Sequence, residues 1–236
     1  MLSVRRLHRY LMALIGIQVL IWMLSGLYMV IFDIDYIRGN HLTKPVYIQP
    51  DVIEQAQPLS NIYQQYSIDG DVSLIPYLNS AAYAFESEGS QQLVDAISGL
   101  SLLPIAESQA QALAISQYRS VDNKIFSITY LDEEAPSELA KRYLPVWRIT
   151  FESPFNDTLY ISANTGQVVT KRHLWWRVFD IFWMLHIMDY ETRSDVANWL
   201  LRFFSSCFIL SIFTGIALLV DRFKFSRRSL KRFGTA

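Results

Sequence analysis

The feature that most limits how this chain can fold is an apolar run over residues 10–32, which holds no charged side chain. About 20 apolar residues in a helix cross the hydrocarbon core of a bilayer, so this run predicts a membrane span. Three arginines precede the run, and Asp33 and Asp35 follow it. Because basic residues are retained on the cytoplasmic side, residues 1–9 are predicted to be cytoplasmic and the chain beyond residue 32 to emerge on the far side.

The run differs from a cleaved signal peptide, which has an apolar core of roughly 7–15 residues and a small-residue cleavage site. Residues 32–36, Phe-Asp-Ile-Asp-Tyr, provide no such site, so we expect the span to be retained as an anchor. Gly16, Ser25 and Gly26 would allow a second helix to approach it closely, although small residues are common in membrane helices.

A second apolar run covers residues 198–220 and contains the single cysteine, Cys207, so no disulfide can form within the chain. Residues 221–236 carry six basic residues and one acid, whereas residues 10–220 carry 12 basic and 21 acidic residues. Basic ends and an acidic middle predict two crossings with both termini in the cytoplasm, where the basic tail touches anionic lipid. The acidic middle argues against nucleic acid as a partner.

Arg202 lies about one turn inside the second run. An arginine near the end of a span either snorkels to the outer surface or pairs with an acid of the preceding segment, here Asp180 or Asp189. Arg202 is therefore a candidate for contact with lipid or with a protein partner.

Residues 33–172 predict a folded domain with both helices and strands. A short helix is expected at residues 58–66, followed by strands at 72–77, 81–86 and 91–95. A second helix near residues 105–118 precedes strands at 124–131, 146–152, 158–163 and 167–171, with a charged, flexible loop over residues 132–143. Asn164-Thr165-Gly166 predicts a hairpin turn, because Asn and Gly tolerate positive φ.

The two halves of this domain, about 50–100 and 104–172, share a weak internal repeat. Phe85-Glu86-Ser87 matches Phe151-Glu152-Ser153, and Val94-x-Ala96-x-x-Gly99 matches Ile161-x-Ala163-x-x-Gly166. We interpret the repeat as two helix-plus-antiparallel-sheet units, in which each sheet buries one face under its helix.

Several segments carry a family resemblance. They are Ile105-x-Glu107-x-x-Ala110-x-x-Leu113-Ala114, Val146-Trp147-Arg148-Ile149 and the hairpin LYISANTGQVV over residues 159–169. These segments resemble a PepSY domain, and the first half, ending VDAISG over residues 94–99, resembles one more loosely. Arg6-Leu7-His8-Arg9, Leu185-His186 and Thr214-Gly215 are similar to the membrane segments of PepSY-associated membrane proteins. The resemblance implies a binding or regulatory protein, because PepSY modules occur in inhibitory propeptides of thermolysin-like peptidases and in envelope accessory proteins.

Residues 173–190 form a tryptophan-rich segment before the second span. Its apolar core, residues 174–188, would make about 22 Å of helix, which is short for a bilayer core of about 30 Å. We predict a helix that lies on or dips into the outer leaflet; a full span is the alternative and would place the basic C-terminus outside. Arg177 and Asp180 are spaced so that they can pair on one helix face, and both are candidates for contact with lipid or a partner.

Motifs for catalysis are missing from the sequence. It contains no His-Glu-x-x-His, Walker loop, Gly-x-Ser-x-Gly elbow, dinucleotide fingerprint or Cys-x-x-Cys pair. We therefore predict no catalytic residue and no metal ligand, and we do not expect an enzyme.

Histidine is the one residue type that suggests a cofactor. His186 lies among apolar and aromatic residues, where an imidazole can ligate haem iron. Some larger PepSY-associated proteins resemble membrane ferric-siderophore reductases with b-type haem, which implies an electron-transfer alternative. His41 is the second ligand candidate, unless another protomer supplies one, since His8 lies at the inner end of the first span. The other interpretation is that no cofactor binds and that His186 is an amphipathic anchor.

The sequence thus predicts an α+β periplasmic domain (33–172) of two PepSY-like units, anchored in the bacterial inner membrane by transmembrane α-helices at 10–32 and 198–220. The interfacial helix at 173–190 and the cytoplasmic segments 1–9 and 221–236 complete the chain. The predicted function is that of a non-catalytic binding, regulatory or accessory subunit for an envelope protein or membrane complex. A small haem b electron-transfer subunit is the alternative.

Overall fold

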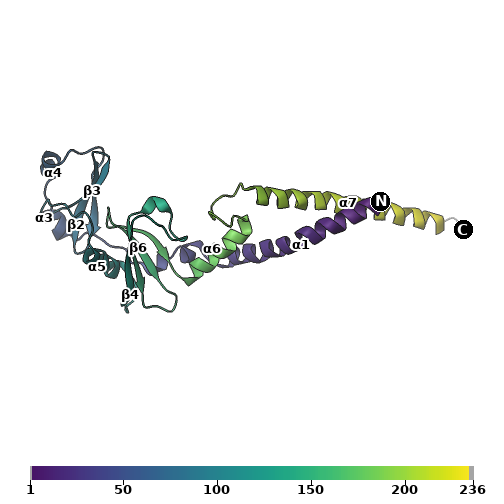
Figure 1. Cartoon of the computed structure of the whole chain (residues 1–236), viewed down its shortest axis with the longest axis horizontal. Coiled ribbons are helices and arrows are strands. Elements are labelled where there is room, and N and C mark those ends of the chain that lie inside the picture. Colours follow the sequence, from purple (N-terminus) through teal and green to yellow (C-terminus); the bar gives the residue numbers. More distant parts are fainter. Residues whose placement is uncertain (1, 234–236) are drawn as a thin grey trace. The chain divides into compact units, whose positions relative to one another are not determined.

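The computed structural model describes residues 2–233 and the side chains of residues 3–224. The side chains of the predicted basic tail therefore lie mostly outside the described residues. The chain forms two compact units (Figure 1). We name them the helical unit, Met1–Phe32 with Phe179–Ala236, and the α+β unit, Asp33–Val178.

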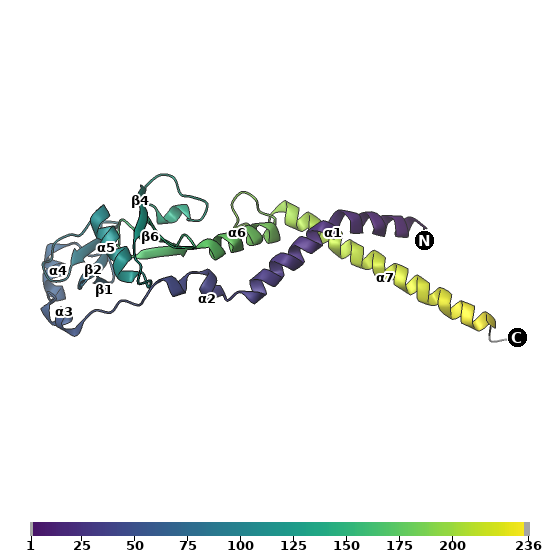
Figure 2. The ribbon, with the colours of Figure 1, turned by 90° about the horizontal axis from the view of Figure 1, so that it is seen from below.

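Two long helices make up most of the helical unit. Helix α1 covers Leu2–Ile31 and α7 covers Trp199–Phe233, and their stretches Ser3–Ile31 and Trp199–Lys224 are long and apolar enough to cross a membrane. The two helices cross and pack against each other (Figure 2). Ile15 is buried, whereas Ile17 and Phe213 are exposed. Such outward apolar side chains are what a helix presents to lipid.

The α+β unit begins with short helices, α2 (Ile34–Ile37) and the 3-10 turn η1 (Asn40–Leu42), and continues as an extended strap over residues 43–49. Helices α3 (Pro50–Gln55) and α4 (Leu59–Gln65) follow. Strands β1 (Ser73–Tyr77), β2 (Ser80–Ser87) and β3 (Ser90–Asp95) then form an antiparallel sheet in the order β1-β2-β3.

The second half follows the same plan with one more strand. Helix α5 covers Glu107–Gln117, and strands β4 (Ile125–Leu131), β5 (Val146–Phe151), β6 (Thr158–Ser162) and β7 (Val168–Arg172) form a sheet in sequence order. The 3-10 turn η2 (Lys141–Tyr143) lies in the β4–β5 connection. Helix α6 (Leu174–Ile187) begins in this unit and ends in the helical unit.

Equivalent aromatic contacts relate the two halves. Tyr66 ends α4 and its ring packs 5.5 Å from that of Phe85 on β2; Tyr118 ends α5 and stacks 3.8 Å from Phe151 on β5. Both phenylalanines are buried. The matching Phe-Glu-Ser segments thus mark the place where each helix end rests on its sheet.

The second matched segment also has equivalent roles. The Ala96 carbonyl accepts from the Gln57 N–H, just before α4, and the Ala163 carbonyl accepts from the Ile105 N–H, just before α5. Three residues beyond each alanine, Gly99 and Gly166 adopt positive φ of 75° and 67°. The repeat in the sequence therefore marks two equivalent turns, after β3 and after β6, each of which accepts a hydrogen bond from the residues just before a helix.

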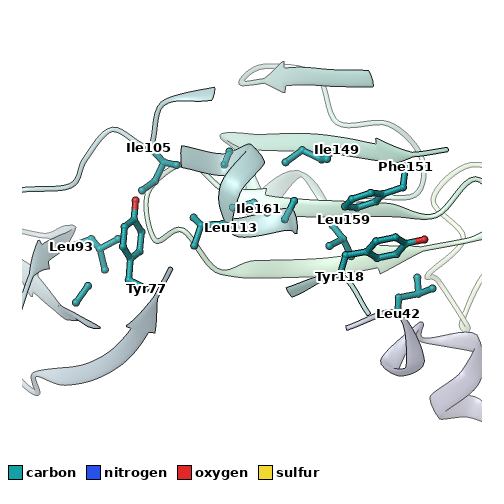
Figure 3. Packing of buried hydrophobic residues seen from close by; sticks show 13 residues of the cluster. Leu42, Tyr77, Leu93, Ile105, Leu113, Tyr118, Ile149, Phe151, Leu159 and Ile161 are labelled. Carbon is teal, nitrogen blue, oxygen red and sulfur yellow. The ribbon is translucent and has the colours of Figure 1, made fainter. Parts of the chain in front are cut away.

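Helix α5 lies between the two sheets, which explains its many alanines. Ala110, Leu113 and Ala114 belong to one buried cluster with residues from both sheets (Figure 3). On the first sheet this cluster includes Leu93, and on the second Ile161. Small side chains allow a helix to approach two surfaces closely at once, while Glu107, Ser108 and Gln111 of α5 stay exposed. The opposite face of the first sheet is covered by α3 and α4.

Two features differ from the sequence prediction. Helix α3 was not among the expected elements; it begins at Pro50, and proline at the first position of a helix needs no N–H partner. The connection over residues 132–143, predicted as a charged flexible loop, packs instead onto the second sheet. Leu139 is 5% exposed and clusters there with Val146 and Tyr160.

Candidate functional site

A partly buried ion pair joins the start of α6 to the β4–β5 connection within the α+β unit. The Arg177 guanidinium donates to Glu138 through Nε at 2.8 Å and through an amino nitrogen at 3.2 Å. The same amino nitrogen also donates to the Thr158 hydroxyl at 3.2 Å, and the second amino nitrogen donates to the Asn156 carbonyl at 3.0 Å. The Tyr160 hydroxyl donates to Glu138 at 2.5 Å. Arg177 thus fixes the start of α6 against the second sheet.

Burial and neighbouring groups shift the pKa values of Glu138 and Tyr160 in this network. Burial alone raises the pKa of Glu138, but hydrogen bonds from Arg177 and Tyr160 outweigh burial, so that the pKa lies below its ordinary value. Burial and the neighbouring Glu138 carboxylate raise the pKa of Tyr160. Glu138 is therefore a carboxylate at neutral pH and accepts every hydrogen bond that it makes.

The pairing of Arg177 with Asp180, which their spacing allowed, is not formed. Asp180 accepts instead from Arg193, in the loop after α6. That loop is held by Asp189, whose carboxylate accepts from the Thr192 hydroxyl at 2.5 Å and from several backbone N–H groups. These hydrogen bonds hold the pKa of Asp189 well below its usual range.

Arg202 lies on the first turn of α7 and is exposed. Among the described side chains it makes no ion pair, since Asp180 pairs with Arg193 and Asp189 is occupied by its own loop. Its predicted pairing with either acid is therefore not formed, and its exposed position is compatible with snorkelling.

His186 packs against α1 within the helical unit. Its Nδ1 lies 2.8 Å from the Ser25 hydroxyl, and its carbonyl accepts from the Trp22 indole at 2.8 Å. Ser25 is fully buried, and a Cβ on Gly26 would lie 3.9 Å from the imidazole. Ser25 and Gly26 thus do receive a second helix, whereas nothing lies within 4 Å of a Cβ on Gly16.

A second histidine contact joins α1 to α7. The Nδ1 of His8 lies 2.9 Å from the Thr214 hydroxyl, and a Cβ on Gly215 would lie 3.3 Å from its Cε1. The sequence placed His8 at the inner end of the first span but did not predict its contact with Thr214. The available signal was Thr214-Gly215, a small hydroxyl and a glycine in an apolar run.

His41 lies in a cluster of rings within the α+β unit. It stacks on Tyr36 with ring centres 4.4 Å apart and meets His173 edge-on at 5.1 Å. His173 is 1% exposed, and its Nε2 lies 3.0 Å from the Tyr36 carbonyl. Burial and then the neighbouring His173 lower the pKa of His41. Among the described residues, no group of three or more metal-ligating side chains forms a metal site.

An unpaired strand edge carries exposed aromatic residues. Within the described residues, strand β4 lies at one edge of the second sheet and pairs only with β5. Phe126 is 74% exposed and Tyr130 is 46% exposed. Exposed edges of this kind are normally protected, because their free N–H and C=O groups can pair with another strand.

The fold combines an α+β unit of two helix-and-sheet repeats with two apolar helices long enough to cross a membrane, which fits a membrane-anchored protein. A family model described as the PepSY-associated TM region matches residues 5–235, and the chain belongs to this family. The resemblance to PepSY-associated membrane proteins is thereby confirmed. No curated protein and no solved structure matches the chain.

Proposed function

We propose that this chain is a non-catalytic, membrane-anchored PepSY protein that binds or regulates an envelope protein or a membrane complex as an accessory subunit. The observation that carries the proposal is strand β4. It offers a free edge with two exposed aromatic side chains, Phe126 and Tyr130. An extended partner segment can add to such an edge through main-chain hydrogen bonds, while aromatic side chains supply much of the contact energy.

The proposed setting is the bacterial inner membrane, crossed by α1 and α7. The basic residues before α1 and after the second span favour cytoplasmic termini, which would place the α+β unit in the periplasm. His186, near the end of α6, packs against Ser25, which lies six residues before the end of α1. Because Ser25 lies inside the proposed span, this contact supports a helix α6 whose C-terminal half dips into the outer leaflet. The repeated helix-and-sheet plan supports two PepSY-like units in this domain.

The test is co-purification from membranes with the full-length tagged chain. The variant Phe126→Lys/Tyr130→Lys places two charges on the β4 edge, and the matched control is Ile53→Lys/Tyr63→Lys, at two side chains that are each 52% exposed. We expect a defined protein to be recovered with the wild type and the control and lost with the β4 variant. Equal recovery with all three chains would contradict the proposed role of β4.

Haem b binding is the second candidate, and His186 is the observation that favours it. Its Nδ1 contact with Ser25 leaves Nε2 with no hydrogen-bond partner among the described residues. A hydrogen bond at one ring nitrogen orients the other for a metal. His41 fits less well, because its ring is packed against Tyr36 and His173. Bound haem would supply one-electron transfer, and another protomer would provide the second ligand.

An absorption spectrum of the purified protein, oxidised and then reduced with dithionite, separates the two candidates. Sharp reduced bands that disappear in His186→Ala would establish the haem function. A featureless spectrum after expression with ample haem would remove it. The accessory function predicts the featureless spectrum.

A further inference from the structure

A polar cavity lies between the two sheets of the α+β unit, at their free edges. Its volume is about 360 Å³. Edge strand β1 contributes Ile75 and Tyr77 to the wall, edge strand β7 contributes Val168 and Lys171, and the end of α5 contributes Gln117. Both β1 and β7 pair with one neighbour only. The cavity is thus bordered by two strands that each retain an unpaired edge.

The extended strap joins this cavity to a second one. Lys44, Pro45 and Val46 line both, and the second cavity has a volume of about 450 Å³. The strap is fixed at its start, where the Lys44 N–H donates to the Gln117 carbonyl at 2.9 Å. Two adjoining cavities along one extended strap offer room for several residues of a second extended segment rather than for a single small ligand.

The charge at this place is positive and uncompensated. Lys171 donates to the Asn40 side chain at 3.1 Å and to the Thr43 hydroxyl at 3.3 Å, and makes no ion pair with any described carboxylate. Burial lowers the pKa of Lys171, as expected for an ammonium group without a counter-charge. Lys44 is exposed at the cavity mouth, and no Asp or Glu lines either cavity. This basic site stands out because the middle of the chain is acidic overall.

We propose that the strap cavities bind an extended, acidic peptide segment of a partner protein, with its carboxylate side chains at Lys44 and Lys171. The main chain of the peptide would use the free edges of β1 or β7, and its apolar side chains would contact Ile75 and Val168. Pro76 limits the donors that β1 can offer, as is usual for an edge strand. The proposal rests on the accessory function above and names the chemistry of the segment that is bound.

The binding test uses the full-length chain in phosphatidylcholine nanodiscs and a fluorescent hexapeptide, Val-Glu-Val-Glu-Val-Glu, with an amidated C-terminus. Fluorescence anisotropy compares it with peptides that carry Gln or Lys in place of Glu. We expect the Glu peptide to bind more tightly than the Gln peptide by about tenfold, a difference of about 1.4 kcal/mol, and to weaken as salt increases. Equal affinity for all three peptides would overturn the proposal.

Two variants locate the site, and one matched variant controls for charge. Lys44→Glu reverses an exposed charge at the mouth, Lys171→Met removes the ammonium but keeps the stem, and Lys141→Glu reverses an exposed charge outside the cavities. Both site variants should weaken the Glu peptide by about tenfold, with the control close to wild type. Equal weakening by Lys44→Glu and Lys141→Glu would show long-range attraction only and would contradict a site at the strap.

Free glutamate distinguishes a peptide site from a site for small anions. At millimolar concentration free glutamate should leave the bound peptide in place, because free glutamate cannot make the main-chain contacts that the peptide makes. Full competition by free glutamate would overturn the peptide assignment.

If the peptide fails to bind while partner recovery still depends on β4, the strap proposal fails and the accessory function stands. If the peptide binds at the strap while recovery is independent of β4, the partner uses the strap alone.

Discussion

Replacing Arg177 with methionine removes the cation that holds Glu138 on the second sheet. The carboxylate would keep the hydrogen bond from Tyr160 and the weaker attraction of Arg172, while its side chain stays 15% exposed. Breaking a fully buried pair costs about 3–5 kcal/mol, because the remaining charge is desolvated without a partner. Since the Arg177 side chain is 31% exposed, solvent reduces this cost, and we expect about 2–3 kcal/mol.

Hydrogen exchange of the full-length chain measures this cost locally. Strand β6 is buried along its whole length and carries Thr158 and Tyr160 of the network. Under conditions where exchange reports the opening equilibrium, 2–3 kcal/mol corresponds to a loss of protection in β6 of about 30- to 150-fold. The control Arg119→Met alters an exposed arginine of the same unit and should leave β6 within about twofold of wild type.

A double-mutant cycle with Glu138→Gln isolates the pair. With the carboxylate already neutral, Arg177→Met should cost clearly less than it does alone, giving a coupling energy of about 1–2 kcal/mol. Additive effects, or β6 protection in Arg177→Met equal to that of Arg119→Met, would refute the conclusion that this ion pair holds α6 to the sheet.

The pH dependence of the same measurement has a defined sign. Because the pKa of folded Glu138 lies below its ordinary value, its contribution to stability is fully present above the unfolded pKa of about 4.3 and is lost as pH falls through the folded value. In Arg177→Met the largest lowering influence is absent while burial remains. The folded and unfolded pKa values of Glu138 should therefore lie closer together, and β6 should lose less protection on acidification than in the wild type.

Two further predictions concern single contacts. The Tyr77 hydroxyl is buried without a hydrogen-bond partner among the described residues, so Tyr77→Phe should stabilise the α+β unit by about 1 kcal/mol. Tyr118→Phe removes a 2.7 Å hydrogen bond to Asp157 and should destabilise the same unit by about 1–3 kcal/mol. Urea denaturation measures both changes. Equal effects of the two variants would contradict this difference. A Cβ at Gly215 would crowd His8, so Gly215→Val should lower the melting temperature of the protein, whereas Gly16→Val should not, because the space around Gly16 is open. A thiol-reactive dye that reacts with Cys207 on unfolding reports this melting temperature. Equal melting temperatures would show that the close approach of α1 and α7 is not needed.

The sequence was informative where local chemistry decides the structure. Strand positions follow from alternating residues between turn signals, and Asn164-Thr165-Gly166 predicts its hairpin because Gly166 must adopt positive φ. The matched Phe-Glu-Ser segments indicated the repeat, although the stacking of Tyr118 on Phe151 requires residues 33 apart in the chain to meet. Two long apolar runs also predicted both long helices.

The polar contacts could not be predicted in the same way. Glu138 lies in a charged connection, and only the neighbouring Leu139 indicated that this connection packs against a surface. The partner of Arg177 is 39 residues away in sequence, so the near acid Asp180 was the only choice that helical spacing offered. Ser25 and His186 are 161 residues apart. Such pairs are fixed by tertiary packing, which a single sequence does not specify.

The most direct test of the accessory function is photocrosslinking in living cells from the edge of β4. Benzoylphenylalanine at Phe126 or Tyr130 of the full-length chain should form one defined adduct with another protein, while the same group at Tyr63, of similar exposure to Tyr130, should not. Adducts of equal yield from all three positions, or none from β4, would contradict the claim that this strand edge is where the protein receives its partner.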